Sequence, residues 1–191
     1  MTENRRPTRA ESTDVANAIL DGTDCVMLSG ESAMGKYPVD AVAMLAGIAA
    51  ATEPNRSHFE ERESLEGLGR GGRVSLEDLI ALSVQTTVRY ASPAAVFVPT
   101  RSGETARCIS RFRLPVWIVG VSSLEATCQR LQFSYGVYPV CEPDHPDEWR
   151  SYARAWLKKT GIEGDLAVVT EGPSSKHPEA SNRMEIIELN R

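Results

Sequence analysis

The sequence predicts an α/β protein: a three-layer α/β/α sandwich around a mostly parallel sheet, preceded by a helix–strand–helix segment. Two observations predict this class. In residues 75–191, short apolar runs of strand length alternate with segments whose apolar side chains recur at helical spacing. Repeated strand–helix pairs favour a parallel sheet that helices cover on both faces. A polar, glycine-rich stretch over residues 53–74 indicates a linker between residues 1–52 and residues 75–191.

Composition excludes several classes of partner. The chain has 191 residues, of which 41% are apolar and 25% charged, as in an ordinary globular protein. Its longest nearly apolar run, residues 41–51, is far shorter than the roughly 20 residues that cross a bilayer, so no membrane partner is expected. The first residues lack the apolar stretch of a secretory signal, and we expect a cytoplasmic protein. The net charge of −5 argues against nucleic acid as a partner.

The cysteines and histidines predict neither a metal site nor a thioredoxin-type site. Four cysteines occur without a Cys-x-x-Cys pair, so we expect reduced thiols that serve as small apolar side chains. The three histidines lie far apart in the sequence, and we therefore expect no metal ligand among them.

The N-terminal part shows a helix, a strand and a second helix. Apolar positions at helical spacing predict a helix over Arg9–Leu20. Residues 25–28 form a short apolar run that suits a buried parallel strand, and residues 29–32 are expected to be the loop that leaves it. Pro38 fits the first turn of a second helix, which continues to about Thr52.

The C-terminal part begins with a helix and then alternates. Ser75 and Asp78, three residues apart, form a variant of a capping pattern, and the helix continues to about Ala91. The final strand is expected to run antiparallel at or near an edge of the sheet. The predicted strands are residues 94–98, 116–121, 136–140, 166–170 and 184–189, and the helices between them are residues 104–112, 124–131 and 147–159.

The most informative segment lies where the strand at residues 94–98 ends and the next helix begins. Backbone N–H groups in the first turn of a helix lack intrahelical partners and attract anions. Hydroxyls add donors, a glycine lets the backbone approach a ligand closely, and an arginine supplies positive charge. The candidate phosphate-binding residues are Thr100, Arg101, Ser102, Gly103 and Thr105.

A purely structural role explains the same residues equally well. Ser102 is a suitable helix cap, and Glu104 in the first turn complements the helix dipole. Glu104 also places a carboxylate near the proposed anion, which opposes phosphate binding.

The loop over residues 172–182 leaves the strand at residues 166–170 on the same side of the parallel sheet. Ligands in such sheets bind outside the carboxyl ends of the strands, so this loop is a candidate lid over the same pocket. Its candidate donors are Lys176, His177, Ser181 and Asn182. A solvated surface loop rich in proline and serine is the alternative.

Several segments resemble the pyruvate kinase family. They follow the family's order along nearly the whole chain, and the N-terminal group is the most specific. The segments are residues 6–11 (Arg-Pro-Thr-Arg-Ala-Glu), 14–18, 20–22, 27–33 (Met-Leu-Ser-Gly-Glu-Ser-Ala), 37–38, 100–107 (Thr-Arg-Ser-Gly-Glu-Thr-Ala-Arg), 110–115, 136–139 and 164–165. The resemblance implies that residues 1–52 are the end of a (β/α)8 TIM barrel and that residues 75–191 are the family's C-terminal α/β domain.

The resemblance also implies an activity that these 191 residues do not carry alone. Pyruvate kinases are glycolytic enzymes that transfer a phosphoryl group from phosphoenolpyruvate to ADP, with Mg²⁺ and K⁺ bound by barrel strands that this sequence does not contain. Stabilisation of the transferring group needs those cations. No catalytic residue or metal ligand is therefore assigned here, Mg²⁺ and K⁺ are expected only for the full-length enzyme, and the hypothesis is that the chain alone is inactive.

Two roles are implied for the C-terminal domain. In many family members it binds a phosphorylated sugar effector through a loop that matches residues 100–105 and a glycine-rich lid that matches residues 172–182. The first loop matches well, but residues 174–180 contain no glycine, so the lid differs from the family's pattern and does not identify the effector. We expect the effector to be either a sugar phosphate or a nucleotide monophosphate.

The alternative role is a stand-alone oligomerisation or interaction module without a ligand. In the family, segments that match the start of this chain and the C-terminal domain lie near subunit contacts. A strand at residues 25–28 would also lack its barrel neighbours and leave backbone groups unpaired. We therefore expect self-association into a homo-oligomer, or packing of residues 1–52 onto the C-terminal domain.

Overall fold

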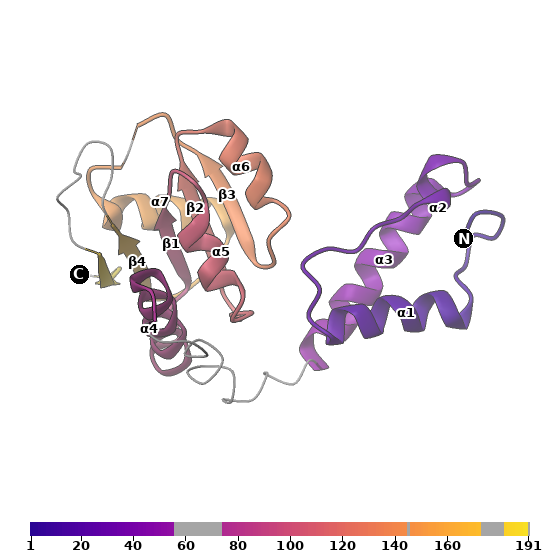
Figure 1. The fold of residues 1–191 in the computed structure, drawn as a ribbon, viewed down its shortest axis with the longest axis horizontal. Coiled ribbons are helices and arrows are strands. Elements are labelled where there is room, and N and C mark those ends of the chain that lie inside the picture. Colours follow the sequence, from indigo (N-terminus) through magenta and orange to yellow (C-terminus); the bar gives the residue numbers. More distant parts are fainter. Residues whose placement is uncertain (56–73, 145, 173–181, 191) are drawn as a thin grey trace. The chain divides into compact units, whose positions relative to one another are not determined.

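The computed structural model describes residues 1–55, 74–144, 146–172 and 182–190. The chain divides into two compact units, Met1–Glu63 and Ser64–Arg191, and Figure 1 labels most of their helices and strands. Of the linker predicted over residues 53–74, only residues 53–55 and 74 belong to the described part.

The described part of the N-terminal unit is helical. Helix α1 (Arg9–Leu20) begins with a capping box: Thr8 Oγ1 accepts a hydrogen bond from Glu11 N–H, and the Glu11 carboxylate accepts one from Thr8 N–H. Helix α3 (Pro38–Thr52) begins with proline in its first turn, as predicted. These two helices pack against each other, and a single 3-10 turn, η1 (Glu53–Asn55), follows α3.

Residues 25–28 do not form the predicted strand. Within the described residues they pair with no other segment, and Met27 is 86% exposed. A strand needs a neighbour for its backbone N–H and C=O groups, and the helical N-terminal unit offers none. The loop predicted over residues 29–32 is also incorrect, since the short helix α2 (Gly30–Ala33) occupies it.

The C-terminal unit alternates helices and strands along the chain. Its helices are α4 (Leu76–Ala91), α5 (Glu104–Ser110), α6 (Glu125–Leu131) and α7 (Trp149–Thr160). Its strands are β1 (Ala95–Pro99), β2 (Trp117–Ser122), β3 (Val137–Cys141), β4 (Leu166–Glu171) and β5 (Arg183–Glu188). All of these elements were predicted within a few residues of their ends.

The five strands form one sheet in the order β3-β2-β1-β4-β5. Strands β1 to β4 run parallel, and β5 runs antiparallel to β4 at the edge. The mostly parallel sheet and the antiparallel edge strand confirm the predicted architecture.

Helices cover both faces of this sheet (Figure 1). On one face, Val96 and Val98 of β1 share an apolar core with side chains from α4, α5 and α6. On the other face, Phe97 of β1 packs in a second core with side chains from α7. Alternate residues of β1 therefore fill two cores, which explains why this strand is apolar throughout.

The predicted helix ends are also observed. Ser75 Oγ accepts a hydrogen bond from Asp78 N–H at 3.0 Å and caps α4, and Gly161 ends α7 with a φ of +70°. None of the helices in the described ranges is long and apolar enough to span a membrane.

Candidate functional site

The order in which strands are added to the sheet changes direction at β1. From β1 the chain proceeds to β2 and β3 on one side, and it then returns to place β4 on the other side of β1. In open parallel sheets the crevice at this switch point is the usual ligand-binding place. Thr100 follows β1 there, and Gly172 follows β4 at the same edge, because Phe97 lies opposite Val169 in a parallel register.

The loop after β1 is held by its own hydroxyl groups. Thr100 N–H donates to the Val121 carbonyl at 2.8 Å, Thr100 Oγ1 accepts a hydrogen bond from Gly103 N–H at 2.9 Å, and Ser102 Oγ accepts one from Glu104 N–H at 3.3 Å. The capping alternative is therefore partly met, since Ser102 does satisfy an N–H group at the start of α5. Each hydroxyl used as an acceptor retains its O–H as a donor.

Gly103 occupies a position where a larger residue would be strained. Its φ is +86°, and an added Cβ would lie 3.1 Å from both Leu131 Cδ2 and Arg107 Nη1. The residue is buried, so its backbone turns tightly between the loop and the neighbouring helix α6. The N–H groups of Thr105 and Ala106, in the first turn of α5, have no intrahelical carbonyl to bind.

Two arginines surround this loop in different ways. The Arg101 side chain is exposed, while its backbone carbonyl accepts a hydrogen bond from the buried Thr127 hydroxyl at 2.7 Å. Arg107 pairs with Glu104 at 2.6 Å, and this ion pair offsets the carboxylate that opposed phosphate binding. Sequence reasoning missed both Arg107 and Thr127. The spacing of Glu104 and Arg107, three residues apart on one helix, predicts the ion pair. No local sequence pattern predicts the hydrogen bond from Thr127 to the Arg101 carbonyl.

The predicted lid falls almost wholly outside the described residues. Lys176, His177 and Ser181 lie outside them. Asn182 is exposed, and its Oδ1 lies 2.6 Å from the position of an added Cβ on Gly172, so the two ends of the loop meet.

The ends of this loop are also tied by charge. Glu171 of β4 lies opposite Arg183 of β5, and their side chains form an ion pair. The Trp149 indole N–H donates to the same carboxylate at 2.6 Å. The chain therefore leaves and re-enters the sheet at a fixed place beside the carboxyl end of β1.

Thr170 is a polar side chain near this end of the sheet that sequence reasoning also missed. It is 2% exposed, and its hydroxyl has no hydrogen-bond partner among the described residues. It follows Val169, the residue opposite Phe97 of β1. A buried hydroxyl without a hydrogen-bond partner is destabilising. The only sequence signal for this feature is a threonine directly after the apolar run of β4.

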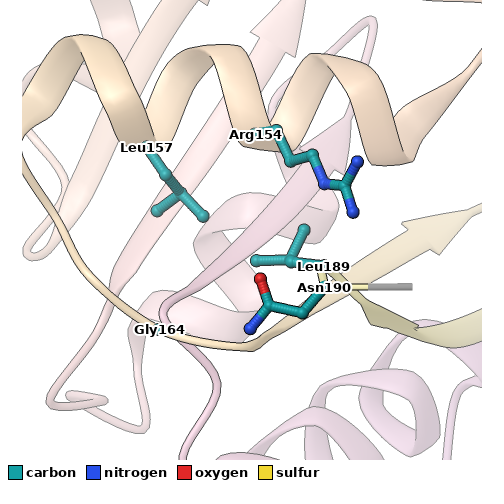
Figure 2. A pocket seen from close by; sticks show the side chains of 5 residues that line it. All are labelled: Arg154, Leu157, Gly164, Leu189 and Asn190. Atoms are coloured by element: carbon teal, nitrogen blue, oxygen red, sulfur yellow. The ribbon is translucent and has the colours of Figure 1, made fainter.

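The pocket in Figure 2 lies elsewhere, before the start of β4. Its volume is about 400 Å³, and its lining residues are Arg154, Leu157, Gly164, Leu189 and Asn190. Gly164 precedes β4, so this pocket lies at the amino end of that strand, the end opposite to the Thr100 loop. Within the described ranges, no group of three or more histidine, cysteine or acidic side chains is arranged to hold a metal ion.

Comparison with known families identifies both units. Residues 1–42 match the pyruvate kinase barrel domain, and residues 78–187 match the pyruvate kinase alpha/beta domain.

Individual relatives agree with this assignment. The chain is 42% identical to a pyruvate kinase of Thermococcus litoralis, over 99% of this chain and 40% of that protein. It is 39% identical to a pyruvate kinase of Geobacillus stearothermophilus, over 97% of this chain and 32% of that protein. A solved structure of Cryptosporidium parvum pyruvate kinase in complex with ADP superposes with a TM-score of 0.85 at 31% identity, covering 98% of this chain and 38% of the other.

The chain spans at most two fifths of the length of these relatives. Because its α/β unit and its N-terminal segment both match the same enzyme, the chain belongs to the pyruvate kinase family, as a C-terminal portion of it.

Proposed function

We propose that this chain is the regulatory and subunit-contact portion of a pyruvate kinase, and that the Thr100 loop binds the phosphate of a sugar phosphate or nucleotide monophosphate effector. The observation that carries the proposal is the placement of this loop at the switch point of the sheet, between the ends of β1 and β4. Thr100, Ser102 and Thr105 bring hydroxyls to that place, and Gly103 brings a buried, tightly turned backbone.

Charge at the loop is compatible with an anion. Glu104 is paired with Arg107, while Arg101 extends an exposed cationic side chain beside Ser102. The first-turn N–H groups of α5 add partial positive charge. Of the proposed lid residues, Asn182 lies beside Gly172, where the loop over residues 172–182 begins and ends. Its side-chain amide can close one side of the site there.

Titration calorimetry with a panel of sugar phosphates and nucleotide monophosphates tests this proposal. We expect one class to release heat, and we expect the variant Ser102→Ala to weaken its binding by several-fold, because an exposed donor is lost. The matched control is Ser151→Ala on the exposed side of α7, which removes a hydroxyl far along the chain from the loop. Absence of heat with every phosphorylated ligand would contradict the proposal.

We further propose that phosphoryl transfer from phosphoenolpyruvate to ADP belongs to the larger enzyme and not to these 191 residues alone. The barrel match covers only residues 1–42, and the resemblance implies that the catalytic cations of the family are bound by other barrel strands. An assay of the purified chain with phosphoenolpyruvate, ADP, Mg²⁺ and K⁺ is expected to give no pyruvate. Robust pyruvate formation that follows this chain through purification would refute this.

A second candidate function is assembly without a ligand. The N-terminal unit exposes large apolar side chains, with Met27, Met34 and Val39 at least 80% exposed, and burial of exposed apolar side chains favours association. Light scattering is expected to show an oligomer. The double variant Thr100→Ala and Ser102→Ala separates the two functions, since it should abolish the calorimetric response and leave the oligomer intact. A monomer at all concentrations would exclude the assembly role.

A further inference from the structure

Two of the four cysteines are neighbours in the C-terminal unit. Cys128 lies in α6, and its Sγ is 3.8 Å from the Ser122 carbonyl oxygen at the end of β2. Ser122 lies opposite Cys141 in the parallel pairing of β2 with β3, and its carbonyl also accepts a hydrogen bond from Glu142 N–H at 2.9 Å. The Cys128 thiol therefore reaches the β2–β3 pair beside Cys141.

The two thiols also interact electrostatically. Burial raises the pKa of Cys128, and the neighbouring Cys141 raises it further through its charge and a side-chain hydrogen bond. Cys108 has different neighbours, with Glu104 and Arg111 acting on its thiol, and Cys25 belongs to the N-terminal unit.

Accessibility differs between the two members of the pair. Cys141 is exposed to solvent, whereas Cys128 is 7% exposed. An oxidant from solution therefore meets the Cys141 thiol more readily than the Cys128 thiol. One accessible thiol beside a buried partner is the arrangement that lets a first, mixed disulfide be resolved within the protein.

We propose that Cys128 and Cys141 form a reversible disulfide when the protein meets a low-molecular-weight disulfide, such as oxidised glutathione. The Cys141 thiolate attacks one sulfur of the oxidant and displaces the other as a thiolate, which gives a mixed disulfide on Cys141. The Cys128 thiol loses its proton to solvent and attacks Cys141 Sγ, which displaces the second small thiol. Two protein thiols are oxidised, and one small disulfide is reduced to two thiols.

The bond would connect α6 to β3 at the carboxyl end of the sheet. Helix α6 also carries Thr127, the residue before Cys128, whose hydroxyl holds the Arg101 carbonyl of the candidate phosphate loop at 2.7 Å. Oxidation should therefore restrain that loop as well, an effect that is measurable without any ligand and does not depend on the proposed effector.

The test incubates the full chain with oxidised glutathione, blocks the remaining thiols by alkylation, and analyses the protein by mass spectrometry. We expect the loss of two hydrogen atoms and a peptide that links Cys128 to Cys141, both reversed by a dithiol reductant. Circular dichroism recorded before alkylation checks that the protein is folded. Hydrogen exchange at residues 100–105 is expected to slow in the oxidised protein, and unchanged exchange there would overturn the restraint on the loop.

Serine variants make the order of events testable. Cys128→Ser is expected to stop at a stable glutathione adduct on Cys141, and Cys141→Ser to form neither the adduct nor the link. The controls Cys25→Ser and Cys108→Ser should behave like the parent chain. A parent chain that keeps glutathione on Cys141 without forming the link, or a link that disappears in either control, would overturn the proposal.

Discussion

The two units of this chain obtain their structure in different ways. Among the described residues, the N-terminal unit contributes only Ile19 and Ala41 to the buried apolar side chains, whereas the C-terminal unit buries two clusters on opposite faces of its sheet. The helices of the first unit rest on local signals such as the Thr8 capping box. The second unit also buries an apolar core. Capping and periodicity therefore define where helices form, whereas burial of apolar side chains supplies most of the stability of a folded unit.

A spectroscopic difference makes this comparison measurable. The three tryptophans, Trp117, Trp149 and Trp156, all lie in the C-terminal unit. Tryptophan fluorescence therefore follows the unfolding of that unit, while far-ultraviolet circular dichroism follows the helices of both.

The largest effect is expected from Phe97→Ala. Phe97 is fully buried and its ring contacts Trp149, Tyr152 and Trp156 at centroid distances of 6.5, 6.0 and 5.7 Å. Removing such a side chain costs about 3–5 kcal/mol, so the fluorescence-detected denaturation midpoint should fall strongly. Met27→Ala in the N-terminal unit removes an 86% exposed side chain and should leave that midpoint unchanged. Equal shifts for both variants would contradict the exposure of Met27.

The next effect is expected from Gly103→Ala, with Gly136→Ala as a matched control. Both glycines have positive φ, +86° and +65°, but an added Cβ meets Leu131 at 3.1 Å only at Gly103, since Gly136 has open space. Backbone strain of this kind costs roughly 1–3 kcal/mol. Denaturation of both variants should show Gly103→Ala to be the more destabilised. Equal losses would show that Leu131 moves away freely.

Prediction from sequence succeeded where the signal was local. The bounds of Arg9–Leu20 were correct because its cap, periodicity and stop lie within the segment itself. The strand at residues 25–28 was not formed because pairing depends on neighbours that the segment cannot specify. In the same way, local sequence predicts residues 100–105 as a strand-to-helix junction, but the Thr127 bond to Arg101 joins residues 26 positions apart. The Thr170 hydroxyl, which lacks a hydrogen-bond partner among the described residues, likewise depends on packing that no local pattern specifies.

A smaller effect is expected from removing one helix cap in each unit. Ser75→Ala deletes the acceptor for Asp78 N–H at the start of α4, and a lost cap costs about 1 kcal/mol. Because α4 packs on the sheet, the fluorescence midpoint should fall accordingly. Thr8→Ala deletes the matching bond in α1 and should reduce helical circular dichroism while leaving the fluorescence midpoint in place. A fluorescence shift with Thr8→Ala would show that α1 stabilises the C-terminal unit.

The smallest effect is a pH dependence at the start of α7. The Glu148 carboxylate accepts hydrogen bonds from Ser151 N–H at 2.7 Å and Arg150 N–H at 2.9 Å. The Ser151 side chain, followed by these two N–H groups, lowers the pKa of Glu148 below the usual 4.5. A carboxyl whose pKa is lower in the folded state stabilises that state fully above its ordinary pKa, and the stabilisation is lost as the pH falls through the folded value.

Acid titration of the fluorescence midpoint measures this contribution, because Trp149 immediately follows Glu148 in α7. The midpoint should hold near neutral pH and decline below pH 4.5, the ordinary value for this group. Glu148→Gln should flatten part of that decline, since a neutral amide does not titrate, whereas Glu163→Gln, an exposed change after α7, should follow the parent curve. An acid response of Glu148→Gln identical to that of the parent would show that this carboxylate does not stabilise the C-terminal unit. Each helix cap thus adds only a small amount to the stability of this unit, because its core supplies the larger part.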